Sequence, residues 1–150
     1  LTDGVRRLLH DSGFPGMKVI QFAFDSREES DYLPHNYEKN CVVYTGTHDN
    51  DTLCGWYKVL DPEDLKLSQK YMNNANTPKR QIHWDFIRLA LASVADLCII
   101  PLQDYLGLGS EARINTPSTL GNNWRWRMTQ GCLTKELADQ IRELTTLYGR

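Results

Sequence analysis

Apolar residues follow two patterns along this chain: short continuous runs and longer stretches with helical spacing. The short runs are rich in β-branched and aromatic residues, which is typical of buried strands, and they predict strands over 17–24, 41–47 and 97–102. The helical spacing predicts helices over 2–11, 52–60, 61–71, 80–94 and 134–148. The polar segments predict loops over 26–40, 73–78 and 107–123, and the alternation at 124–127 predicts a short extended piece.

The order of these elements indicates an α/β fold. Apolar strands that alternate with helices form parallel β/α units. A sheet of three such strands would leave both of its edges open and hydrophobic. We therefore expect the chain to be part of a larger β/α structure.

Polar side chains stand at the C-terminal end of each predicted strand. In a (β/α)8 barrel these strand ends converge on one face and build the active site. Three such endings in succession therefore predict a shared site rather than unrelated turn residues. The side chains are Asp25 after the first strand, His48 and Asp49 after the second, and Gln103 and Asp104 after the third.

Aromatic residues lie close in sequence to the same strand ends. Sugar rings have apolar faces and hydroxyl edges, so aromatic faces beside carboxylates and amides suit them. Core packing is the alternative interpretation, particularly for Phe22 and Tyr44. The aromatic residues in question are Phe22, Phe24, Tyr32, Tyr44, Trp56 and Tyr57.

Composition narrows the function classes. At 150 residues and 41% hydrophobic content the chain can bury one sizeable core, and its net charge of −2 gives no electrostatic reason to expect nucleic acid or an anionic membrane. No apolar run approaches the roughly 20 residues that span a bilayer. The four cysteines are widely spaced, which favours reduced thiols and a cytoplasmic location. Because no methionine leads the chain, we expect that it was cut from something longer or processed.

Several motifs resemble one family throughout the chain. They are similar to the C-terminal third of the 4-α-glucanotransferases, also called amylomaltases or disproportionating enzymes, of glycoside hydrolase family 77. The central motif, Val43-Tyr44-Thr45-Gly46-Thr47-His48-Asp49-Asn50-Asp51-Thr52, is the most specific. The other matching segments are 14–19, 32–37, 99–104, 112–117, 123–127 and 148–150.

The resemblance implies a fold and a reaction. Residues 1–150 would be a C-terminal segment, about strands six to eight with flanking helices, of a (β/α)8 barrel whose N-terminal part is absent. The complete enzyme would cleave an α-1,4-glucan such as a maltooligosaccharide or amylose and pass the piece to another glucan or to glucose. Retention of configuration would proceed through a glycosyl-enzyme, without a cofactor or metal.

The resemblance also implies roles for individual residues. Asp49 matches the acid that stabilises the transition state, and His48 matches the neighbour that hydrogen-bonds the same sugar. The nucleophilic Asp and the acid/base Glu would lie ahead of this chain, so the chain alone is expected to be inactive. The other substrate-binding candidates are Asp25, Phe22, Trp56, Gln103, Asn115 and Pro117.

Two other readings are open. Asp49-Asn50-Asp51 is a literal DxD, and such carboxylates hold a divalent cation in nucleotide-sugar glycosyltransferases, although no nucleotide-binding pattern accompanies it. The chain could also be a non-catalytic carbohydrate-binding or interaction module. Metal sites built on His35, His48 or His83 have no supporting spacing.

Overall fold

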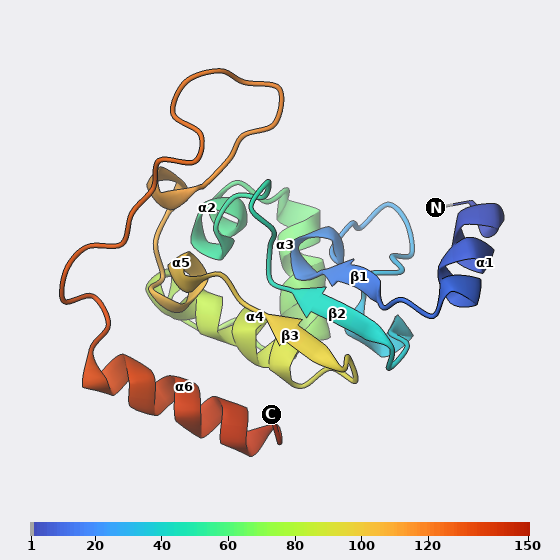
Figure 1. Cartoon of the computed structure of the whole chain (residues 1–150). Coiled ribbons are helices and arrows are strands. Elements are labelled where there is room, and N and C mark those ends of the chain that lie inside the picture. The colour runs from blue at the N-terminus through green and yellow to red at the C-terminus, as the bar shows by residue number, and fades with distance from the viewer. Residues whose placement is uncertain (1) are drawn as a thin grey trace.

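Three short parallel strands form one sheet in the computed structural model, which describes residues 2–150 (Figure 1). The strands are β1 (Gly16–Val19), β2 (Cys41–Tyr44) and β3 (Leu97–Ile99), paired in that order. Val19 pairs with Tyr44, and Tyr44 pairs with Ile99, so the three C-terminal ends lie at one edge of the sheet. The predicted parallel β/α arrangement is therefore confirmed.

The predicted helices form, and local sequence explains where they begin. Asp61 caps one helix through its side chain, with Pro62 in the first turn, and the Thr52 and Thr134 hydroxyls cap two others. The α-helices are α1 (Asp3–Ser12), α2 (Leu53–Lys58), α3 (Pro62–Tyr71), α4 (Ile82–Leu91), α5 (Leu102–Tyr105) and α6 (Lys135–Leu147). Short 3₁₀ turns are η1 (Ile20–Phe22), η2 (Pro34–Asn36), η3 (Lys79–Gln81) and η4 (Ser110–Ala112).

The core lies between β2 and the helices that follow it. Val43 of β2, Leu53 of α2 and Phe86 of α4 are all fully buried in one apolar cluster. The Phe86 ring lies 5.2 Å from the ring of Trp56 and 5.8 Å from that of Phe24, both edge-on. This aromatic contact connects the core to the residues that follow β1 and β2.

The opposite face of the sheet is open. Met17, Leu97 and Ile99 point to that face, and they are 56%, 56% and 46% exposed. Strands of parallel sheets are usually buried on both faces. In the described chain the helices cover only one face of the sheet. The apolar side of α1 is also exposed, and α1 stands apart from the sheet in Figure 1.

All three strands end earlier than predicted. After Val19 the backbone turns into η1, and the Gln21 side-chain amide donates to the Asp51 carbonyl at 2.7 Å. After β3 the chain reaches Pro101, which has no N–H for strand pairing, and α5 begins. The extended piece predicted at 124–127 is absent from the described strands, because Trp124 adopts a left-handed turn conformation with φ of 62°.

Three further features concern membrane-spanning length, the cysteines and the C-terminal residue. Within residues 2–150, no helix combines the length and the apolar character needed to cross a membrane. All four cysteines are free thiols. The Arg150 guanidinium donates to the carbonyls of Leu91, Ser93 and Ala95, and so satisfies the backbone at the end of α4.

Candidate functional site

The segment after β2 is a tight turn fixed by side chains. The Asn50 carboxamide oxygen accepts from both the amide and the hydroxyl of Thr47, each at 2.8 Å. Gly46 lies just before this turn, and a Cβ there would lie 2.6 Å from the side-chain amide nitrogen of Gln21, which would have to move. Glycine therefore lets Gln21 reach the Asp51 carbonyl, and the turn is anchored to the end of β1.

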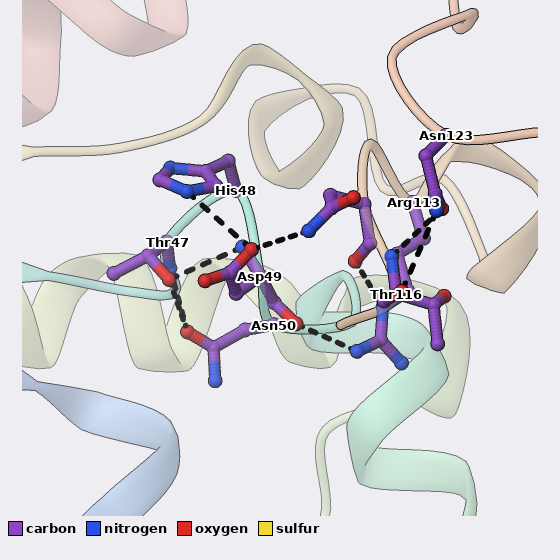
Figure 2. A network of polar contacts seen from close by, with 8 residues as sticks. Thr47, His48, Asp49, Asn50, Arg113, Thr116 and Asn123 are labelled. Atoms are coloured by element: carbon purple, nitrogen blue, oxygen red, sulfur yellow. Dashed lines mark hydrogen bonds and ion pairs between the residues drawn. The ribbon is translucent and has the colours of Figure 1, made fainter. Parts of the chain in front are cut away.

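The turn presents His48 and Asp49 side by side, as Figure 2 shows. The Asp49 Oδ1 atom accepts a hydrogen bond from the Asn115 amide at 2.6 Å and lies 3.4 Å from His48 Nε2. Both side chains are about half exposed. Within the described residues, no protein donor is assigned to Asp49 Oδ2. One carboxylate oxygen is thus held in place, and the other has no hydrogen-bond donor among the described residues.

A second segment, which follows β3 and η4 in the chain, holds the same turn by hydrogen bonds. Arg113 Nη2 donates to the Asp49 carbonyl at 2.6 Å, a contact visible in Figure 2. Arg113 Nε donates to the backbone carbonyl of Asn115, and the backbone N–H of Asn115 donates to the His48 carbonyl at 3.1 Å. These bonds hold the backbone on both sides of the Asp49 side chain.

Three of the candidate residues gather at the end of β1. Phe22, Asp25 and Trp56 line one open cavity of about 590 Å³. Arg27 donates two hydrogen bonds of 2.7 Å to the Asp25 carboxylate, and this pairing lowers the Asp25 pKa to about 2. Asp25 is therefore an ionised hydrogen-bond acceptor at neutral pH rather than a proton donor.

The remaining candidates have different surroundings. Gln103 is buried and donates to the Ala112 carbonyl at 3.3 Å, and it shares a small cavity of about 70 Å³ with His48. Pro117 is exposed on the loop beyond Asn115. The structure thus brings His48, Asp49 and Asn115 together, and it places Phe22, Asp25 and Trp56 around a separate cavity.

Asp104 connects two of the strand ends from inside. Its side chain is 2% exposed, and it accepts from the Thr45 hydroxyl at 2.6 Å and from the Leu53 amide at 2.8 Å. Leu53 opens α2, so the carboxylate satisfies the beginning of that helix. Burial raises the Asp104 pKa to about 6, partly opposed by these two hydrogen bonds.

This raised pKa predicts a pH-dependent stability difference between the wild type and Asp104→Asn. The folded protein holds the Asp104 proton more tightly than the unfolded chain does, so this stabilising contribution is present below about pH 4 and is lost as the pH rises through about 6. Asn cannot ionise. As the pH rises from 4 to 7, the free energy of unfolding of Asp104→Asn should increase relative to that of the wild type by up to about 3 kcal/mol.

Urea unfolding at several pH values measures this difference. Asp96→Asn, at an exposed acid, serves as the matched control and should track the wild type within about 0.5 kcal/mol. A constant difference between the wild type and Asp104→Asn across this range would contradict the prediction.

Sequence reasoning missed three residues that shape the site. Arg113 and Trp124 were noted only as parts of motifs, and Asp104 was noted only as a polar side chain at the end of the third strand, not as a buried group. The Trp124 ring lies 5.0 Å from the His48 ring. The turn-forming residues before Trp124 indicated that the chain reverses direction there. Local sequence carried no signal that Trp124 would contact His48, which lies 76 positions earlier.

The two carboxylates of the DxD sequence have different partners. Asp49 accepts from Asn115, whereas Asp51 accepts from the Ser110 hydroxyl at 2.6 Å and from the Thr52 amide at 2.8 Å. Across positions 2–150, no group of three or more His, Cys, Asp or Glu residues is arranged to hold a metal ion.

Known proteins match this chain in both sequence and overall fold. The 4-alpha-glucanotransferase model of glycoside hydrolase family 77 matches residues 1–134. A 4-alpha-glucanotransferase of Clostridium butyricum is 49% identical over 151 residues, which cover 100% of this chain and 31% of the relative. The chloroplastic/amyloplastic 4-alpha-glucanotransferase of Arabidopsis thaliana is 46% identical, with 100% and 26% covered.

Solved structures of amylomaltases resemble this chain in fold. The amylomaltase of Streptococcus agalactiae in complex with acarbose is 38% identical with a TM-score of 0.93, covering 100% of this chain and 30% of that one. The amylomaltase of Corynebacterium glutamicum, 13% identical with a TM-score of 0.70 over 97% of this chain and 27% of its own, shares the fold. The predicted partial (β/α)8 barrel is therefore confirmed. The chain spans about a third or less of these relatives, and it belongs to the 4-alpha-glucanotransferase family, glycoside hydrolase family 77.

Proposed function

We propose that this chain is about strands six to eight of a longer 4-alpha-glucanotransferase, referred to below as the complete enzyme. The complete enzyme moves α-1,4-glucan segments between chains with retention of configuration. The relatives supply the activity, and the open sheet face of Met17, Leu97 and Ile99 supports the placement. In a barrel that face points to the packed interior, which the other strands complete.

The Asp49 carboxylate carries this proposal. It stands at the C-terminal end of the middle strand, where barrel enzymes place their chemistry. Asn115 and His48 fix its Oδ1 atom, and its Oδ2 atom has no hydrogen-bond donor among the described residues. A fixed carboxylate of this kind stabilises the positive charge that develops on the sugar in the oxocarbenium-like transition state.

The other acids of this region do not suit the roles of nucleophile or proton donor. Asp25 is held ionised by Arg27, and both Asp51 and Asp104 are engaged by internal donors. Asp104 has the pKa nearest to neutrality, but it is buried away from substrate. Retaining glycosidases need a carboxylate pair about 5–5.5 Å apart. We therefore assign that pair to the part of the enzyme outside this chain.

The substrates follow from the same site. The Streptococcus agalactiae relative binds acarbose, a finding that supports sugar-ring recognition at the corresponding surface here. We assign maltooligosaccharides and amylose as donors, and a glucan or glucose as acceptor. The residues proposed to contact the sugar are His48, Phe22, Asp25, Trp56, Gln103, Asn115 and Pro117. The cytoplasm is the proposed compartment, supported by the four free thiols.

Disproportionation of maltotriose tests the proposal. A chimera that carries these 150 residues in place of the matching 31% of the Clostridium butyricum relative serves as a complete enzyme. We expect it to release glucose and longer maltooligosaccharides, whereas the isolated chain should show no transfer. A folded chimera without transfer would contradict the proposal.

Two additional measurements separate the rival functions. The transfer should be unchanged by a chelator, because the mechanism needs no metal. Loss of activity with EDTA and rescue by Mn²⁺ would favour the nucleotide-sugar alternative. Saturable maltooligosaccharide binding by the isolated chain, with an inactive chimera, would favour a binding module.

A further inference from the structure

The segment from Arg113 to Trp124 is a loop closed at its base. The Trp124 amide donates to the Ile114 carbonyl at 2.7 Å, and the Thr116 amide donates to the Asn123 side chain at 2.9 Å. Compact loops with their ends held together in this way are frequently functional. The tip of this loop projects into solvent with Leu120 fully exposed, so the loop does not serve to fill the core (Figure 1).

The base of this loop is attached to the Asp49 turn. The Arg113 side chain donates to the Asp49 carbonyl, and the backbone N–H of Asn115 donates to the His48 carbonyl. These bonds fix the backbone of the turn and do not involve the His48 imidazole. Among the described residues, that ring has an ionic contact with Asp49, at 3.4 Å, and an aromatic contact with the indole of Trp124.

Trp124 has an unusual backbone for its type. Its φ is 62°, in the left-handed region that a bulky side chain rarely adopts. Packing within this chain does not explain this strain, because Trp124 is 64% exposed here. The strained turn does place the indole 5.0 Å from the His48 ring, at an interplanar angle of 39°. Strain of this kind is concentrated at functional sites.

We propose that Trp124 is a positioning residue that acts through His48. The left-handed turn holds the indole against the imidazole and restricts the ring to the orientation in which Nε2 faces Asp49 Oδ1. This inference rests on the proposed function of the Asp49 site. It assigns the exposed aromatic residue of the 124–127 segment a role that packing does not supply.

Variants of the complete enzyme separate the indole from the backbone strain. Trp124→Ala should lower kcat about tenfold with KM changed less than about threefold, the scale of one lost aromatic pair. Trp124→Gly accepts a positive φ without strain and should show the same loss. Trp124→Phe should recover most of the activity, because it keeps a ring. Trp126→Ala, in the same segment and without a ring contact to His48, is the control and should resemble the wild type.

A double-mutant cycle identifies the path of the effect. If Trp124 acts through His48, then adding Trp124→Ala to His48→Ala should cost little more than His48→Ala alone. Effects that multiply, or a raised KM with unchanged kcat, would overturn the proposal and indicate that Trp124 touches the substrate itself. Wild-type kinetics in Trp124→Ala would also overturn it.

A spectroscopic measurement tests the contact without using activity. In the complete enzyme with labelled histidine, Trp124→Ala should shift the His48 ring protons as the ring current of the indole disappears, whereas Trp126→Ala should leave them in place. Unchanged His48 signals in Trp124→Ala would overturn the inference even in an active enzyme. A shift in an enzyme without transferase activity would instead place the failure in the proposed function.

Discussion

Asp49→Asn in the complete enzyme should lower kcat by about 10²- to 10³-fold or more, with a much smaller change in KM. The substitution keeps the size of the side chain but removes the negative charge that faces the developing oxocarbenium-like sugar. The ground-state sugar is neutral, so its binding should depend less on that charge. Initial rates of maltotriose disproportionation measure the effect.

The fold of this variant should be intact. The Asn115 amide can still donate to the remaining carbonyl oxygen of Asn at position 49, and the backbone contact from Arg113 is unaffected. Asp139→Asn, the same substitution at a surface acid of α6, should retain wild-type turnover. Near-normal maltotriose transfer by Asp49→Asn would refute the assignment of Asp49. An unfolded variant would refute the claim that the substitution removes the charge and leaves the fold intact.

Local sequence was sufficient for most of the helices. Asp61-Pro62 and Thr134 are capping signals that act within three residues, and the structure uses both. The parallel direction of the strands also followed from the alternation of apolar runs with helical stretches. These features depend on short-range chemistry, which one sequence displays directly.

The strand ends and the arrangement of the site depend on distant partners. Just after the first strand, the Gln21 side chain donates to the Asp51 carbonyl, 30 residues away. Asn115 was a candidate by resemblance alone, and its bond to Asp49 spans 66 residues. No local pattern specifies such pairs. The open sheet face has a different cause: the apolar strands of this chain require covering elements that it does not itself provide.

The core and the site are coupled through Phe86, and Phe86→Ala should destabilise the protein by about 3–5 kcal/mol. The Phe86 ring is fully buried, and its loss leaves a cavity beside Phe24 and Trp56. Both of these neighbours line the open cavity that also contains Asp25. The loss of Phe86 should therefore also loosen that wall and raise the KM for maltooligosaccharides below the melting temperature.

Thermal unfolding of the complete enzyme measures the first effect, and kinetics at low temperature measure the second. Leu120→Ala, at a fully exposed loop tip, is the control and should change stability by less than about 0.5 kcal/mol. A melting temperature of Phe86→Ala within about 2 °C of the wild type would contradict the packing argument. Lower stability with an unchanged KM would instead mean that the cavity wall is held by contacts other than Phe86, since Phe24 also packs edge-on against Tyr71 at 5.7 Å.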